Sequence, residues 1–167
     1  MKTTLVIIRG NSGSGKSTVA GQLQLLLEGT LLVPQDVVRR DMLRVKDNIG
    51  NLSVELIKQI ALYGNGKMNY VIVEGILSTR KYKTMLMELI ETFEESYVYY
   101  YDISLKETIA RHKTKPNAAD FGESELTAWY TDNDFLDLPN EKIISETMSV
   151  DETVEMILSD IGTVSKA

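Results

Sequence analysis

Cysteine is absent from the 167-residue sequence, and histidine occurs once, as His112. The chain therefore has no disulfide, no thiolate metal site and no cysteine nucleophile. The N-terminal segment has only a short apolar run, Leu5 to Ile8. That run is too short for a signal-peptide core or a membrane span, so we expect a cytoplasmic protein with no membrane partner.

Positive charge is also scarce, since 18 Lys and Arg residues face 24 Asp and Glu residues and give a net charge of −6. A polynucleotide partner is disfavoured, because proteins that bind polyanions depend on clustered Lys and Arg, although a local basic patch stays compatible with this balance. Apolar residues make up 43% of the chain and charged residues 25%, as in ordinary globular proteins. The length and composition predict a single domain covering residues 1–167.

Short apolar runs rich in β-branched or aromatic residues alternate with segments of helical periodicity. The runs predict five parallel strands: Leu5 to Ile8, Leu31 to Val33, Val71 to Val73, Val98 to Tyr101 and Ile143 to Ile144. The patterns Ser104-x-x-Glu107 and Ser149-x-x-Glu152 predict two helix starts with capping boxes. Alternating strands and helices predict an α/β fold, a three-layer sandwich with helices on both faces of a parallel sheet.

Residues 115–141 interrupt this alternation and are predicted to form a lid, with a short helix around Glu123 to Tyr130. From Pro116 to Glu141 there is no Lys or Arg, and seven acidic residues accumulate. Such a segment repels a polynucleotide backbone. It either closes over a small acceptor, with Trp129 and Tyr130 excluding water, or forms a solvated loop held by Trp129.

The segment Gly10 to Ser17 fits the pattern G-x-x-x-x-G-K-[ST] in full. It lies between a predicted strand and a predicted helix, which is the context that confirms a P-loop. Its backbone N–H groups and the following helix N-terminus favour an anion. Lys16 is expected to bridge the β- and γ-phosphates of a nucleoside triphosphate during catalysis, and the Ser17 hydroxyl to bind Mg²⁺. The predicted nucleotide-binding residues are Asn11, Ser12, Gly13, Ser14, Gly15, Lys16, Ser17 and Thr18.

The second predicted strand ends at Gln35-Asp36. In open parallel sheets, ligands bind beyond the carboxyl ends of the strands, so Asp36 is expected beside the P-loop. There it acts either as a helix N-cap or as a base for an acceptor hydroxyl, and we predict the catalytic role.

Three arginines, Arg39, Arg40 and Arg44, lie on the predicted helix from Val37 to Arg44. Arg40 and Arg44 are four residues apart and are expected to share a helix face. These arginines either bind an anionic group of the acceptor or form a solvated face with Asp41 as counterion.

The third predicted strand ends in an acid, Glu74, at the position of a Walker-B carboxylate. Glu74 either orients Mg²⁺ through water or contacts the acceptor. The predicted metal-binding residues are Ser17 and Glu74, and the predicted substrate-binding residues are Asp36, Arg39, Arg40 and Glu74.

The predicted helix from Leu105 to Thr114 ends in a cationic segment containing Arg111, His112 and Lys115. Lid arginines of small-molecule kinases stabilise transition-state charge, so Arg111 is predicted to be catalytic, with Lys16 and Asp36. The same cations also complement the helix dipole. His112 is expected on the surface.

No Asn-Lys-x-Asp guanine-reading motif occurs, and the chain has little room for elements that couple hydrolysis to mechanical work. The sequence therefore favours an ATP- and Mg²⁺-dependent kinase acting on the hydroxyl of a small-molecule acceptor. Two alternatives stay open. One is a polynucleotide 5′-hydroxyl kinase, and the other is a non-catalytic binding module whose lid is ordered by ATP.

The P-loop, the Gln35-Asp36-x-x-Arg39 segment and the strand ending at Glu74-Gly75 together resemble the nucleotide- and nucleoside-kinase-like P-loop phosphotransferases. Within that group the chain looks like the branch of chloramphenicol phosphotransferase, zeta-toxin-type kinases and polynucleotide 5′-kinase domains, and like bacterial chains labelled as uridine kinases. The resemblance implies that Asp36 is the base and that Arg39 contacts the acceptor. It also implies the sheet order 2-3-1-4-5 and an adenine site between the lid helix and Ser145 to Met148. A single lid arginine departs from the arginine-rich lid of nucleoside monophosphate kinases.

Overall fold

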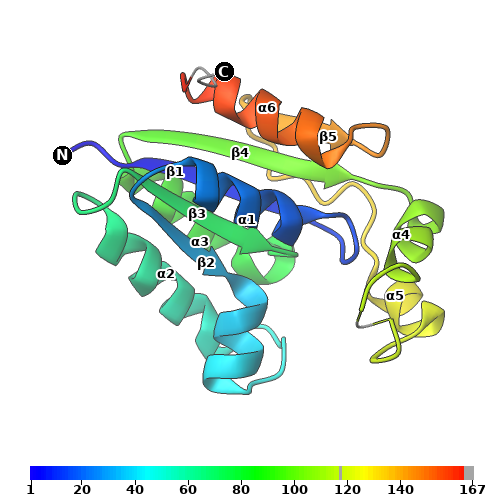
Figure 1. Cartoon of the computed structure of the whole chain (residues 1–167). Helices are drawn as coiled ribbons and strands as arrows, with labels where there is room; N and C mark the ends of the chain where they lie inside the picture. The colour runs from blue at the N-terminus through cyan, green and yellow to red at the C-terminus, as the bar shows by residue number, and fades with distance from the viewer. Residues whose placement is uncertain (117, 164–167) are drawn as a thin grey trace.

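The computed structural model describes residues 1–116 and 118–163. Asn117, within the predicted lid, and residues 164–167, at the end of the predicted domain, lie outside the described residues. Strands and helices alternate along the chain as the sequence predicts (Figure 1). The elements are β1 (Thr4–Gly10), α1 (Lys16–Leu26), β2 (Thr30–Pro34), η1 (Val37–Leu43), α2 (Leu52–Gly64), β3 (Tyr70–Gly75), α3 (Thr79–Thr92), β4 (Glu95–Asp102), α4 (Leu105–His112), α5 (Glu123–Trp129), β5 (Glu141–Ser145) and α6 (Val150–Asp160).

The five strands form one parallel sheet in the order β2-β3-β1-β4-β5, which confirms the predicted topology. Strand β1 is central, with Ile7 opposite Val73 of β3 on one side and Val98 of β4 on the other. Because all strands run in one direction, their carboxyl ends meet at one edge of the sheet. The P-loop therefore emerges between the ends of β3 and β4.

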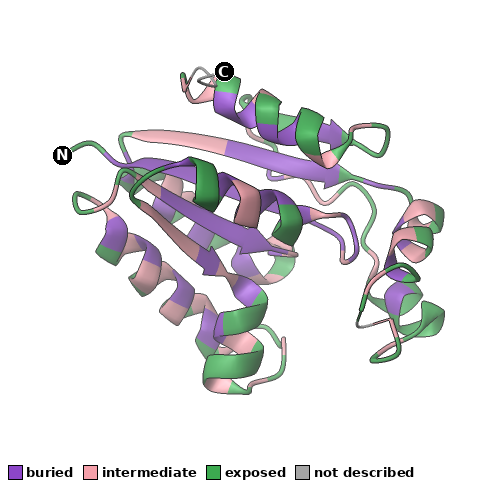
Figure 2. Cartoon of the chain, in the orientation of Figure 1, coloured by how far each residue is buried: buried purple, intermediate pink, exposed green. Residues whose placement is uncertain are grey.

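Alternate residues of the central strand serve two separate cores. Leu5 and Ile7 pack with residues of α2 and α3, and Val6 and Ile8 pack with residues of α1 and α6. The sheet is buried between these helices, whose outer faces are exposed (Figure 2). This arrangement is the predicted three-layer α/β sandwich.

The two predicted capping boxes differ in the structure. Ser149 and Glu152 form both reciprocal bonds at the start of α6. At the start of α4, the Ser104 hydroxyl accepts from the Glu107 N–H, but the Ser104 N–H donates to Glu146 instead. The Glu107 carboxylate pairs with Arg111. Glu146, distant in the sequence, thus accepts the hydrogen bond that Glu107 would accept in a complete capping box.

The predicted helix after β2 forms as a π-helix, η1, and Arg44 follows it in a left-handed conformation with φ 56°. The predicted helix therefore ends one residue earlier than expected, so Arg40 lies on η1 and Arg44 lies beyond its end.

Helices α4 and α5 lie beyond the carboxyl edge of the sheet, away from the two helical layers (Figure 1). The short helix α5 confirms the helix predicted around Glu123 to Tyr130. In residues 1–116 and 118–163, no helix is long and apolar enough to cross a membrane.

Candidate functional site

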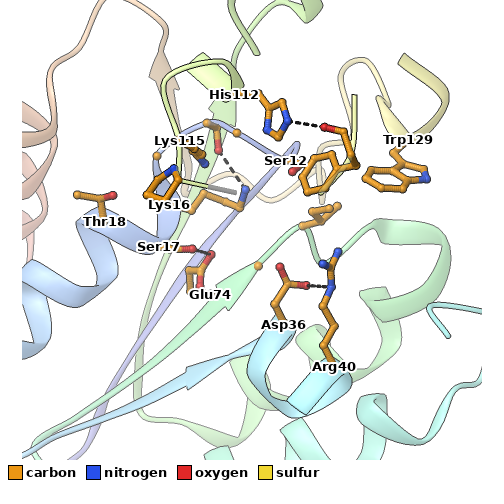
Figure 3. Close-up of a pocket in the computed structure, with 17 residues that line it drawn as sticks. Ser12, Lys16, Ser17, Thr18, Asp36, Arg40, Glu74, His112, Lys115 and Trp129 are labelled. Carbon is orange, nitrogen blue, oxygen red and sulfur yellow. Dashed lines mark hydrogen bonds and ion pairs between the residues drawn. The ribbon is translucent and has the colours of Figure 1, made fainter. Parts of the chain in front are cut away.

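The P-loop forms one wall of a cavity of about 370 Å³ at the carboxyl edge of the sheet (Figure 3). Residues Ser12 to Thr18 line it directly. Gly13 and Gly15 adopt positive φ angles of 80° and 102°, which L side chains rarely adopt. A side chain at Gly13 would also press on the backbone of α4, since an added Cβ would lie 3.1 Å from the Thr108 carbonyl oxygen. The glycine spacing therefore shapes the loop and lets α4 pack against it.

Lys16 begins α1 and is buried inside the loop. Its Nζ donates to the Asn11 carbonyl oxygen at 2.7 Å and to Ser14 Oγ at 3.0 Å. Burial lowers the pKa of Lys16 to about 8, and the nearby Glu74 carboxylate opposes that shift. An anion bound in the loop would favour the charged form of this lysine.

Ser17 and Glu74, the two predicted metal-binding residues, lie together although they are far apart in sequence. Ser17 Oγ donates to Glu74 Oε1 at 3.0 Å. Burial raises the pKa of the Glu74 carboxyl, with Lys16 acting in the opposite direction. A hydroxyl and a carboxylate are the hard oxygen donors that Mg²⁺ prefers, so these residues fit a magnesium ion.

Protein groups alone do not complete a metal shell here. Among the residues that the structure describes, no group of three His, Cys, Asp or Glu side chains could hold a metal ion. A Mg²⁺ ion at Ser17 and Glu74 would need phosphate oxygens and water as its other ligands, as is usual for nucleotide-bound magnesium.

Asp36 lies just after β2 and lines the same cavity as the P-loop. Its side chain is 65% exposed and makes ion pairs of 3.5 Å with Arg39 Nη2 and Arg40 Nε. It forms no capping hydrogen bond at the start of η1. The Asp36 carboxylate is therefore paired with arginines and open to the cavity, and it does not cap the helix.

The two arginines beside Asp36 have different surroundings. Arg40 lines the cavity, with its side chain 49% exposed. Arg39 is not among the lining residues; its Nη1 donates to the Val45 carbonyl oxygen at 3.1 Å, and its Nε is buried without a partner. Arg39 thus fastens the turn after η1, while Arg40 faces the site.

Arg111, on α4, is not among the cavity-lining residues. Its guanidinium donates to Glu107 Oε1 at 2.9 Å, to the Ser14 carbonyl oxygen at 2.8 Å and to the Glu146 carbonyl oxygen at 2.8 Å. These bonds tie α4 to the P-loop and to the loop after β5. The lid cation that does line the cavity is Lys115.

His112 is buried, so its predicted surface position is wrong. Its ring stacks on Phe121 with centroids 4.4 Å apart, and its Nε2 lies 2.7 Å from the Phe121 carbonyl oxygen. Phe121 in turn contacts Trp129, with centroids 5.1 Å apart. The three rings form the aromatic wall of the cavity, opposite Asp36 and Arg40 (Figure 3).

The side chain of Asn11 fastens the chain after α5 to the P-loop. Its Nδ2 donates to the Thr131 carbonyl oxygen at 2.7 Å, and its Oδ1 accepts from the Thr131 N–H at 2.9 Å. Asn11 is absent from the cavity lining, unlike the seven residues that follow it. The sequence predicts that Asn11 contacts the nucleotide, but its side chain is hydrogen-bonded to the lid at Thr131.

A buried charge cluster secures the same segment at its far end. Arg9, whose side chain has no exposed surface, pairs with Asp134 at 2.7 Å and with Glu141 at 3.1 Å. Asp134 also accepts from the Thr79 N–H at 3.0 Å, at the first residue of α3. One carboxylate thus joins β1, α3 and the lid.

Several of these residues gave weak signals in the sequence. Arg9 is a charge at the end of an otherwise apolar strand, directly before the P-loop, and such a residue needs a buried partner. His112, Lys115 and Phe121 carry no motif, and only the fold brings them to the cavity.

Solved structures with similar backbones share this fold. The APS kinase of Mycobacterium tuberculosis, solved with AMPPNP and APS, has a TM-score of 0.70 and 16% identity, covering 96% of this chain and 98% of that one. A tunicamycin resistance protein of Deinococcus radiodurans has a TM-score of 0.68 and 14% identity, covering 98% of each chain. A gluconokinase of Sinorhizobium meliloti has a TM-score of 0.63 and 16% identity, covering 95% of this chain and 90% of that one. No protein-family model and no curated protein sequence matches the chain. At these identities, the likeness shows a P-loop kinase-like fold.

Proposed function

We propose that this chain is an ATP- and Mg²⁺-dependent phosphotransferase acting on the hydroxyl group of a small-molecule acceptor. One observation carries the proposal: the exposed carboxylate of Asp36 lines the same cavity as Lys16 and the other residues from Ser12 to Thr18. A phosphate cradle and a candidate base in one cavity are the two parts that transfer to a hydroxyl requires.

In this proposal, the backbone N–H groups of residues 12–18 and the Lys16 ammonium group hold the triphosphate. Bound Mg²⁺, held by Ser17 and Glu74, supplies positive charge that offsets the phosphate oxygens. Asp36 orients the acceptor hydroxyl and accepts its proton as the oxygen attacks the γ-phosphorus; the bond from this phosphorus to the β,γ-bridging oxygen breaks, and ADP leaves. Arg39 and Arg40 hold the Asp36 carboxylate in place through their ion pairs.

The adenine group is proposed to lie between α4 and the segment from Ser145 to Met148. Arg111 and Ser104 already connect these parts, through the Glu146 carbonyl oxygen and carboxylate. The bonds from Arg111 to Ser14 and Glu146 give it a positioning role in this proposal.

The acceptor is proposed to be small, because the 370 Å³ cavity has to contain both the reacting phosphate and the acceptor. Arg40 provides a cation for an anionic group, and Phe121 and Trp129 provide an apolar wall. The acidic segment from Pro116 to Glu141 opposes a polynucleotide backbone. The APS kinase and the gluconokinase that share this fold are named after small acceptors, which supports this part of the proposal.

A transfer assay with radiolabelled γ-phosphate of ATP tests this function. Purified protein with Mg²⁺ is given panels of nucleosides, sugars, hydroxylated antibiotics and anionic alcohols, and a 5′-hydroxyl oligonucleotide at low salt. The proposal expects label on at least one small compound and none on the oligonucleotide. Label on the oligonucleotide alone would replace the small acceptor with a polynucleotide, and failure of the wild-type protein to bind ATP would refute both.

A further inference from the structure

Helix α4 and the first residue of the lid carry two long cationic side chains near the P-loop, Arg111 and Lys115, and the structure gives them different surroundings. Arg111 uses its guanidinium on Glu107, Ser14 and Glu146 and stays out of the cavity lining. Lys115 lines the cavity, beside Lys16 (Figure 3). The lid cation that faces the phosphate site is therefore the lysine.

Burial and the charged residues of the same cavity set the electrostatic surroundings of the Lys115 ammonium group. Burial lowers the pKa of Lys115, while the Glu74 and Asp36 carboxylates oppose that shift. Lys115 also helps to lower the pKa of Lys16, after the larger effect of burial. Lys115 thus lines one cavity with the candidate metal ligand, the candidate base and the P-loop lysine.

Backbone bonds fix where Lys115 leaves the lid. Its N–H donates to the His112 carbonyl oxygen at 3.0 Å, and its carbonyl oxygen accepts from the Ala118 N–H at 3.1 Å. Across residues 1–116 and 118–163, no carboxylate lies within ion-pair distance of its Nζ. A half-buried ammonium group with no protein counterion is a strong partner for an anion.

We propose that Lys115 contacts the γ-phosphoryl group of the bound triphosphate and is the catalytic cation of the lid, whereas Arg111 positions α4 on the P-loop. The inference rests on the proposed function, since it assumes that the cavity takes a nucleoside triphosphate. A lysine suits this role because its compact charge, on a flexible stem, can follow a phosphoryl group as it moves.

The test compares the affinity for Mg²⁺-AMPPNP with that for Mg²⁺-ADP by isothermal titration calorimetry. AMPPNP carries a γ-phosphoryl group and ADP does not. Lys115→Met is expected to weaken AMPPNP binding by roughly ten- to a hundredfold, the size of one hydrogen bond to a charged group, and to change ADP binding less than about twofold. Lys115→Arg is expected to keep most of the AMPPNP affinity.

Two further variants make the result specific. Lys113→Met removes an exposed lysine at the end of α4 that does not line the cavity, and is expected to change neither affinity. Arg111→Met is expected to weaken both nucleotides by a similar factor, because it loosens Ser14. If Lys115→Met weakens both nucleotides equally, or neither, this inference is overturned while the proposed function stands. If the wild-type protein binds neither nucleotide, both are overturned.

Discussion

Replacing Asp134 by asparagine removes one of the two carboxylates that neutralise a buried guanidinium. The Arg9 side chain has no exposed surface, and the Asp134 and Glu141 side chains are only 14% and 4% exposed. Water therefore has no access to the Arg9 guanidinium to solvate the charge left without its partner. Asp134 Oδ2 also accepts from the Thr79 N–H at the start of α3, and Asp134 Oδ1 accepts from the Thr79 hydroxyl, so an asparagine would have one oxygen for three donors.

The size of the effect follows from this geometry. Breaking a buried ion pair by removing one partner costs about 3–5 kcal/mol, because an uncompensated charge is left inside. Glu141 remains beside Arg9 and lessens the imbalance, so we expect the low end, about 3 kcal/mol. Domains are stable by only about 5–15 kcal/mol, so this loss is a large share of the total.

Urea unfolding followed by circular dichroism measures this change. At a slope of about 1–3 kcal/mol per molar, a loss of about 3 kcal/mol lowers the unfolding midpoint by roughly 1 M or more with the slope unchanged. Asp137→Asn, at an exposed lid position with no ion pair to a described residue, is the control and should move the midpoint little. An Asp134→Asn midpoint equal to that of the control would refute the claim that this cluster holds the lid to the sheet.

Three further predictions concern the P-loop. Burial lowers the pKa of Lys16 to about 8 and a bound triphosphate favours its charged form, so AMPPNP affinity should fall up to roughly tenfold per pH unit above pH 8. Calorimetry in buffers of different ionisation enthalpy should show proton uptake on binding at pH 9. Gly13→Ala should weaken AMPPNP binding, because the added Cβ would press on α4. Gly66→Ala is the control: Gly66 has a similar positive φ, but its added Cβ would lie in open space, so this variant should lower stability only. Asn11→Ala should speed hydrogen exchange at the Thr131 amide by about tenfold or more, and an unchanged rate would contradict the described clamp.

The layered fold could be predicted from two patterns. The strands are short apolar runs, and in the helical segments between them apolar residues recur every three to four positions. The P-loop motif fixed the position of Lys16 and Ser17, since its chemistry depends on neighbouring residues alone. The meeting of Ser17 and Glu74 also followed from the topology, because the ends of β1 and β3 are adjacent in the sheet. Local pattern and strand order together were enough for these parts of the site.

The lid could not be predicted in the same way. Whether Arg111 or Lys115 lines the cavity depends on where carbonyl oxygens of the P-loop and of the β5–α6 loop lie, and no local pattern encodes that. His112 is buried and stacks on Phe121, and neither residue belongs to a motif. Contacts made by a folded lid, rather than by regular elements, decide these roles.

The central claim is that Asp36 and the P-loop form one transfer site, and Asp36→Asn tests it most directly. The variant keeps the size of the side chain and removes the group that accepts a proton. Transfer of labelled γ-phosphate to the acceptor should fall by roughly a hundredfold or more, while AMPPNP affinity stays within about twofold of the wild-type value. Transfer at the wild-type rate by Asp36→Asn would contradict the account.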